Sequence, residues 1–138
     1  MKKILIILIS LLSAFSASAE IKMTRLFGDH MILQQKTKNA IWGWTTAHAK
    51  ITVKASWGAS ATGKADAKGK WQVFLPTPGH GTDFSLSISD GKETKTIKDV
   101  AIGEVWLCAG QSNMGWALGN TFGGDEEAAA ADSPNFRI

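Results

Sequence analysis

Apolar and polar side chains alternate along most of the chain between residues 21 and 102. In the stretches 71–75 and 84–88, apolar residues recur at every second position, and the second stretch runs into Asp90-Gly91, a strong hairpin signal. Successive side chains of a strand point to opposite faces, so this pattern predicts strands with one buried face. Further apolar stretches at 31–33, 40–44 and 51–53 are separated by turn residues. This spacing predicts an antiparallel β-sandwich over residues 20–99.

The pattern changes after Asp99. Residues 100–108 are nearly all apolar, and Gly103 and Glu104 are the interruptions. A continuous apolar run predicts a strand that is buried on both faces, as in a parallel sheet. We therefore assign residues 100–138 to the start of a second, incomplete α/β domain.

Short helices are expected in this second part. Residues 112–118 place Met114 and Leu118 on one face of one or two helical turns. The acidic residues 125–127 precede four alanines, and acidic side chains are favourable at a helix N-terminus. Residues 136–138 predict the beginning of another strand, so we expect the protein to continue beyond them.

Residues 1–19 have the pattern of a secretory signal peptide. Lys2 and Lys3 precede an apolar run at 4–15, and small residues at 17–19 form a cleavage site before Glu20. The run is shorter than the roughly 20 residues that a membrane-spanning helix needs. We expect an exported protein, periplasmic or extracellular, without a membrane anchor after cleavage.

Composition narrows the possible partners. The formal net charge is +3, and removal of Lys2 and Lys3 leaves 13 basic residues against 12 acidic ones. The remaining lysines are scattered between strand-like stretches, which does not support a nucleic-acid partner. Cys108 is the single cysteine, so an intrachain disulfide is excluded.

The turn after the apolar run is the candidate site. Gly110, Gln111 and Ser112 follow a predicted strand and precede a predicted helix. A tight turn of this kind exposes a serine hydroxyl and directs backbone N–H groups at the same space, as an oxyanion hole requires. Serine is also a common helix N-cap, so the residues alone leave both interpretations open.

A wider pattern favours the nucleophile. Residues 103–114, G-E-V-W-L-C-A-G-Q-S-N-M, resemble the nucleophile block of the sialate O-acetylesterase family within the SGNH hydrolase superfamily. Residues 26–34, L-F-G-D-H-M-I-L-Q, resemble that family's N-terminal signature, and 41–44, 69–71 and 75–76 also match in order. The resemblance covers essentially all of the chain after residue 19.

The resemblance implies a β-sandwich ahead of an SGNH hydrolase domain that starts near residue 100. It implies release of acetate from O-acetylated sialic acid or a related acetylated sugar. Ser112 would attack the acetyl carbonyl to form an acyl-enzyme, and its own N–H would be one oxyanion donor. The family's second glycine, its asparagine donor and its Asp-x-x-His element are not found after Ser112, so we expect the 138-residue chain to lack most catalytic machinery. Asn113 belongs to the first block and is distinct from that later asparagine.

One position departs from the family. Gly115 stands where an acidic residue commonly follows the methionine of the block. At this position the sequence therefore supplies no carboxylate that could help to place the substrate.

Other reactive residue types have plainer interpretations. Cys108 is interpreted as a packed small hydrophobic residue, and His30 as part of a turn that enters a strand. His48 and His80 have no partners at ligand spacing, so we predict neither a metal site nor a cofactor. Trp42 and Trp44 share one strand face, where we favour packing of the sandwich over a sugar-stacking platform.

Two alternative functions remain open. Abundant tryptophan and the lack of a histidine after Ser112 are compatible with a secreted carbohydrate-binding or interaction sandwich without catalysis. The nucleophile block also fits an esterase for acetylated plant polysaccharide of the xylan type, because specificity depends on pocket residues elsewhere. The sequence leaves the oligomeric state open.

Overall fold

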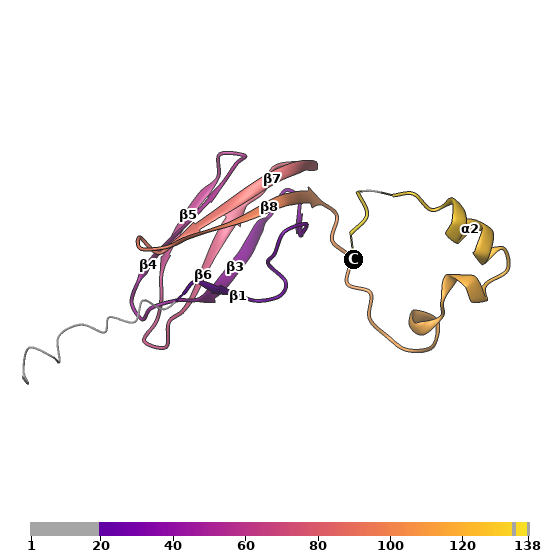
Figure 1. Cartoon of the computed structure of the whole chain (residues 1–138), viewed down its shortest axis with the longest axis horizontal. Helices are drawn as coiled ribbons and strands as arrows, with labels where there is room; N and C mark the ends of the chain where they lie inside the picture. The colour runs from indigo at the N-terminus through magenta and orange to yellow at the C-terminus, as the bar shows by residue number, and fades with distance from the viewer. Residues whose placement is uncertain (1–19, 134, 138) are drawn as a thin grey trace, which may run out of the picture.

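The computed structural model describes residues 20–133 and 135–137, and the predicted signal peptide lies outside them. Two β-sheets pack face to face, and a further segment extends from one end of them (Figure 1). The strands are β1 Lys22–Met23, β2 Ile32–Gln34, β3 Lys38–Trp44, β4 Lys50–Ala55, β5 Ser60–Lys64, β6 Lys70–Pro76, β7 Gly81–Ser89 and β8 Thr94–Gly103. The short helices are η1 Ser112–Gly115, η2 Leu118–Asn120 and α2 Gly124–Ala130. The predicted mainly β fold is confirmed.

One sheet has the order β1-β3-β6 and the other β2-β8-β7-β4-β5. Neighbouring strands are antiparallel except for β2 and β8, which are parallel with Ile32 opposite Ala101. That pair is the exception to the predicted antiparallel sandwich. Among the described residues, no helix is long and apolar enough to cross a membrane.

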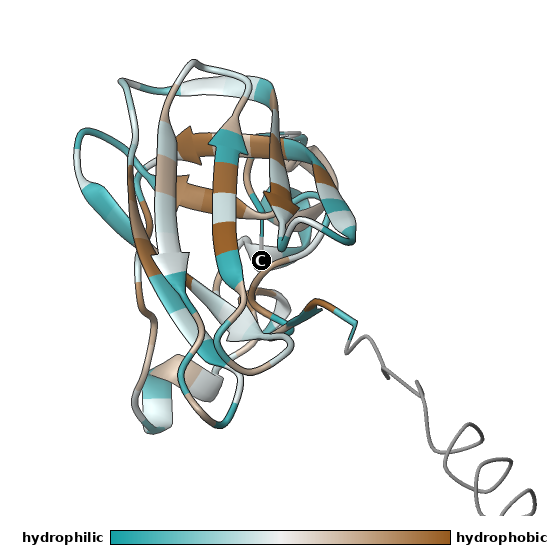
Figure 2. Ribbon diagram, turned by 90° about the vertical axis from the view of Figure 1, so that its left-hand side faces the viewer, coloured by the Kyte–Doolittle hydropathy of each residue, from teal (hydrophilic) through white to brown (hydrophobic). Residues whose placement is uncertain are grey.

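The core lies between the two sheets and follows the alternation in the sequence. In β6 the side chains of Trp71, Val73 and Leu75 are buried and those between them are exposed. Figure 2 shows the same alternation of apolar and polar bands along the strands. Opposite β6, Ile51, Val53, Leu86, Ile88, Ile97 and Val100 close the core from the five-stranded sheet. Burial of one face of each strand supplies most of the stabilisation.

The Asp90-Gly91 hairpin is present between β7 and β8. One carboxylate oxygen of Asp90, Oδ1, accepts hydrogen bonds from the backbone N–H groups of Lys92 and Glu93, at 2.9 and 2.8 Å. Gly91 has φ 88°, a conformation that glycine adopts without steric cost. The sequence signal therefore identified both the turn and the residues that close it.

The strand predicted at 100–108 is shorter than expected. β8 ends at Gly103, and residues 104–110 have no regular structure, with Trp106 82% exposed and Leu107 92% exposed. Residues 100–102 are buried because β8 is an inner strand, flanked by β2 and β7. The buried part of the apolar run, residues 100–102, therefore belongs to the sandwich sheet. Beyond Gly103 the run belongs to no sheet.

The remaining predicted elements differ in detail. In place of one helix at 112–118 there are two separate 3-10 turns, η1 and η2, and both Met114 and Leu118 are exposed. Helix α2 matches the acidic start and alanine run. Phe136 and Arg137 are not in a strand, and Ile138 lies outside the described residues. Where the SGNH hydrolase domain begins stays a prediction.

Candidate active site

Ser112 is exposed at the start of η1 and has a left-handed backbone. Its φ is 57°, Gly110 before it has φ 152°, and Gln111 between them is extended. The N-cap of η1 is Gln111, and no side-chain hydrogen bond caps it. The interpretation of Ser112 as an N-cap is therefore wrong. A positive φ is compatible with a nucleophile turn. Five other described non-glycine residues share it: His30, Lys36, His48, Asp83 and Asp99.

Gly110 is required by the geometry of this turn. A Cβ at this position would lie 2.9 Å from Cγ of Met114, and φ 152° is a conformation that residues with a side chain rarely adopt. The turn folds back through a hydrogen bond from the Met114 N–H to the Gln111 carbonyl, 3.4 Å long. Glycine therefore lets the chain turn sharply enough to present Ser112.

A hollow of about 600 Å³ is formed by residues that closely follow Ser112 in the sequence. Its lining comprises Asn113, Trp116, Leu118 and Thr121, all from η1, η2 and the adjoining turns. Two apolar side chains together with an amide and a hydroxyl can hold a small ester and orient its carbonyl. Ser112 itself does not line this hollow.

No described histidine lies in hydrogen-bond contact with Ser112. His30 bonds to Asp99 at the end of the sandwich, His48 lies between β3 and β4, and His80 lies just before β7. Among the described residues, no three His, Cys, Asp or Glu side chains gather in a way that would hold a metal ion. The described part of the chain thus presents Ser112 without a base.

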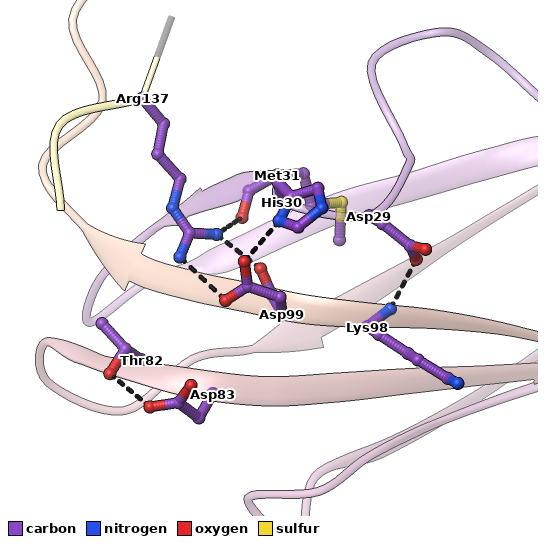
Figure 3. A network of polar contacts seen from close by, with 8 residues as sticks. All are labelled: Asp29, His30, Met31, Thr82, Asp83, Lys98, Asp99 and Arg137. Carbon is purple, nitrogen blue, oxygen red and sulfur yellow. Dashed lines mark hydrogen bonds and ion pairs between the residues drawn. The ribbon is translucent and has the colours of Figure 1, made fainter. Parts of the chain in front are cut away.

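A polar cluster that the sequence did not indicate forms around Asp99. Oδ2 of Asp99 lies 2.5 Å from Nδ1 of His30, and Oδ1 accepts from Nη2 of Arg137 at 2.9 Å (Figure 3). The backbone of His30 was predicted to turn into a strand and does so just before β2. Asp99 and His30 are 69 residues apart, so no local spacing could have indicated the pair.

The charges of this end of the molecule are stabilised by hydrogen bonds. The His30 and Arg137 side chains lower the pKa of Asp99 below its usual value of 3.8. The amides of Gln34 and Gln35 likewise lower the pKa of Glu104, which directly follows β8. Both carboxylates are therefore ionised at neutral pH and available as acceptors.

Cys108 and Trp44 lie differently from what the sequence predicts, whereas Trp42 packs against the sandwich core as predicted. Cys108 is exposed and is not a packed core residue, because the chain has left the sheet at Gly103. Trp42 and Trp44 lie on the outer face of β3, since Ile41 and Gly43 occupy its buried face. Trp42 is half-buried and meets Phe27 edge to face with ring centroids 4.6 Å apart, whereas Trp44 is 41% exposed.

Comparison with known proteins places these features in a family. A comparison with models of protein families finds no match. The sialate O-acetylesterase of Rattus norvegicus is 34% identical to this chain over 109 residues, which are 72% of this chain and 20% of the relative. That of Homo sapiens is 32% identical over 109 residues, 72% of this chain and 21% of the relative. The chain belongs to a sialate O-acetylesterase-like family.

The fold of this chain is also similar to that of a solved structure. The crystal structure described as a novel carbohydrate acetylesterase from Xanthomonas citri matches with a TM-score of 0.74 and 35% identity, over 83% of this chain and 26% of that one. The chain spans about a fifth of the length of the curated family members it matches. The β-sandwich that the resemblance implies is present in this chain, and its position ahead of a hydrolase domain stays a prediction.

Proposed function

We propose that this chain is the N-terminal part of an exported carbohydrate O-acetylesterase in which Ser112 is the nucleophile. The single observation that carries the proposal is the turn that exposes Ser112. Ser112 has φ 57°, and Gly110, two residues earlier, has a conformation that a residue with a side chain could adopt only with strain. The names of the similar proteins, sialate O-acetylesterase and carbohydrate acetylesterase, support the substrate class.

The reaction follows from serine chemistry. Oγ of Ser112 attacks the acetyl carbonyl while a base accepts its proton, and the N–H of Ser112 stabilises the negative charge on the carbonyl oxygen. The bond between the acetyl carbon and the sugar oxygen then breaks, and that oxygen takes the proton from the base and leaves as the sugar's hydroxyl group. Water, with its proton taken by the base, attacks the acyl-enzyme and releases acetate and free Ser112. The proposed reaction also needs a base and further oxyanion donors, and the described residues do not place such groups against Ser112. We therefore expect the 138-residue chain alone to be slower than the full-length protein by about 10⁴-fold or more.

Acetate release from O-acetylated sialic acid by the full-length protein tests this proposal. The substitution Ser112→Ala keeps the Cβ, and hence the conformational demand of the turn, and removes the nucleophile. We expect turnover to be lost in Ser112→Ala and kept in Ser133→Ala, which changes an exposed serine of the same segment. Retained turnover in Ser112→Ala would remove Ser112 from its role, and turnover of acetylated xylan but not sialic acid would assign the polysaccharide substrate.

Export is part of the proposal and rests on residues 1–19. Lys2 and Lys3, the apolar run and the small residues before Glu20 have the order that signal peptidase recognises. N-terminal sequencing of the protein recovered outside the cytoplasm should begin at Glu20. Recovery of an intact Met1 in the cytoplasm alone would contradict export.

A second candidate function, sugar binding by the sandwich, is favoured by the outer face of the three-stranded sheet. Trp44 is exposed on β3, and the register places Lys22 of β1 and Lys70 of β6 directly beside it. An indole with a lysine on either side suits an anionic sugar, whose ring stacks and whose carboxylate pairs with an ammonium group.

Binding of sialic acid to the 138-residue chain, measured by NMR titration, tests this second candidate. We expect Trp44→Ala to abolish the chemical shift changes without unfolding the protein. The matched control is Phe74→Ala, which removes an aromatic ring that is 57% exposed on the same face. Equal loss in both variants, or no binding by the unaltered chain, would contradict a site at Trp44.

A further inference from the structure

The segment that carries Ser112 is attached to the sandwich at its first residues. The carboxylate of Glu104 accepts hydrogen bonds from Nε2 of Gln34 at 2.9 Å and Nε2 of Gln35 at 2.6 Å. Oε1 of Gln34 in turn accepts from the backbone N–H of Val105 at 2.8 Å. The Gln34 amide therefore uses both its donor and its acceptor to set the direction in which the chain leaves β8.

The same segment is attached again at its last described residues. Nη2 of Arg137 donates to Oδ1 of Asp99 at 2.9 Å, and Nη1 donates to the backbone carbonyls of Asp99 and Met31 (Figure 3). Arg137 is largely buried, with 16% of its side chain exposed. A planar guanidinium that binds a carboxylate and two carbonyls is fixed in orientation as well as in position.

The second attachment is itself held in shape. His30 has φ 67° and Asp99 has φ 50°, left-handed values that histidine and aspartate adopt more readily than most residues with a side chain. Oδ1 of Asp29 accepts from the backbone N–H of Lys98 at 2.7 Å, and the N–H of His30 donates to the Lys98 carbonyl at 3.2 Å. These bonds place the His30 ring against Asp99, so that the carboxylate faces Arg137.

Between the two attachments the segment has little support of its own. Residues 106–133 are exposed except for Gly123 and Gly124, and Figure 1 shows them looping away from the sandwich and back. Gly124 packs so closely on the Leu118 carbonyl that a Cβ would lie 1.8 Å from the oxygen, which joins η2 to α2. The contacts at its two ends therefore determine where this segment lies relative to the sandwich.

We propose that residues 29–35 form a double clasp that holds both ends of the segment 104–137, and that Gln34, Gln35 and Asp99 are thereby positioning residues for Ser112. The clasp stands on the contacts above, and its consequence for Ser112 rests on the proposed function. The sandwich is then the platform that sets where the nucleophile lies.

Cys108 provides the probe, because it is the single cysteine, exposed and four residues before Ser112. A spin label on Cys108 and a second on the exposed β4 position of Lys54→Cys report the distribution of distances between segment and sandwich. We expect the distribution to widen about twofold or more in Asp99→Asn and in the double variant Gln34→Ala, Gln35→Ala, since a loop freed at one end samples more volume. Asparagine tolerates positive φ, so the first variant keeps the backbone.

Matched controls are Asp83→Asn and Gln72→Ala. Asp83 also has positive φ and is exposed on the neighbouring strand, where its carboxylate accepts from the Thr82 hydroxyl and does not touch the segment. Gln72 is exposed on β6. Unchanged widths in the clasp variants, or equal widening in the controls, would overturn the clasp whatever the activity.

A second measurement tests the consequence for Ser112. In the full-length protein we expect Asp99→Asn to lower kcat for an acetylated sugar by about 10²-fold with little change in KM, because a small misplacement of a nucleophile is costly. Unchanged kcat alongside an inactive Ser112→Ala would overturn the positioning role. Full turnover in Ser112→Ala would overturn the proposed function and the positioning role with it, while the distance distributions still decide the clasp.

Discussion

At the scale of single residues, the turn at Ser112 stores conformational strain. A left-handed φ at a residue with a side chain costs about 1–2 kcal/mol, and Ser112 at φ 57° lies on an exposed segment with no core around it. Gly110 takes the other positive φ of the turn without a Cβ, so the turn avoids a second cost of this kind. The turn therefore depends on one glycine more than on packing.

The substitution Gly110→Ala tests this dependence. Its Cβ would meet Met114 at 2.9 Å and adopt an unfavourable φ, so we expect the turn to rearrange and acetyl-ester turnover by the full-length protein to fall by about tenfold or more. Circular dichroism of the sandwich should not change. Gly115→Ala is the control, since a Cβ there meets nothing within 4 Å, and equal losses in both variants would contradict the prediction.

At the scale of elements, the β7–β8 hairpin is closed by one carboxylate with several donors. Oδ2 of Asp90 accepts from the Thr45 hydroxyl at 2.7 Å, in addition to the two backbone N–H groups bound by Oδ1. Partial burial acts to raise the pKa of Asp90, but the N–H groups of Glu93 and Lys92 and the Thr45 hydroxyl outweigh it, so the pKa lies below 3.8. The hairpin thus ties the five-stranded sheet to the end of β3.

This lowered pKa predicts how stability depends on pH. Folding favours the ionised form of Asp90, so its contribution is fully present above the unfolded pKa and disappears as the pH falls through the folded pKa, below 3.8. We expect the unaltered chain to be more stable than Asp90→Asn near pH 7, and the difference to shrink below about pH 4. Urea unfolding at several pH values measures this, and a constant difference down to pH 2 would contradict it.

At the scale of the whole molecule, a well-packed sandwich carries a segment that exposes apolar side chains. Its exposed large apolar residues are Val105, Trp106, Leu107, Met114, Trp116, Leu118, Phe122 and Phe136. Soluble monomers rarely leave large contiguous apolar patches uncovered. The proposal of a longer enzyme agrees with this surface, because a further domain would cover it.

This surface predicts that the 138-residue chain associates with itself as its concentration rises. We expect sedimentation velocity to detect the association, and the double variant Trp106→Ser, Leu107→Ser to reduce it, since less apolar area is then available for burial. Leu26→Ser is the control, because Leu26 is 70% exposed on the sandwich and outside the segment. A monomer at all concentrations would contradict the prediction.

Sequence reasoning succeeded where the cause is local. The period of two in β6 predicted which of its residues are buried, and Asp90-Gly91 predicted a turn, because strand geometry and turn chemistry act over a few residues. It failed at 104–108, where the apolar run continues although the strand has ended at Gly103. An apolar run states that a segment is suited to burial, and it does not state which neighbour buries it.

For the candidate site, the residues Gly110, Gln111 and Ser112 and the turn that contains them were accessible from the sequence, as was the family that they resemble. The alternation within the strands, the hairpin and the identity of the candidate nucleophile follow from the sequence, since each depends on residues adjacent in the chain. The boundary predicted at residue 99 did not, because β8 continues to Gly103 in the sandwich sheet. Tertiary structure alone decided that Trp44 faces outward, and that His30, Asp99 and Arg137 meet. Those contacts join residues dozens of positions apart, and only the packing of the sheets brings them within hydrogen-bond distance.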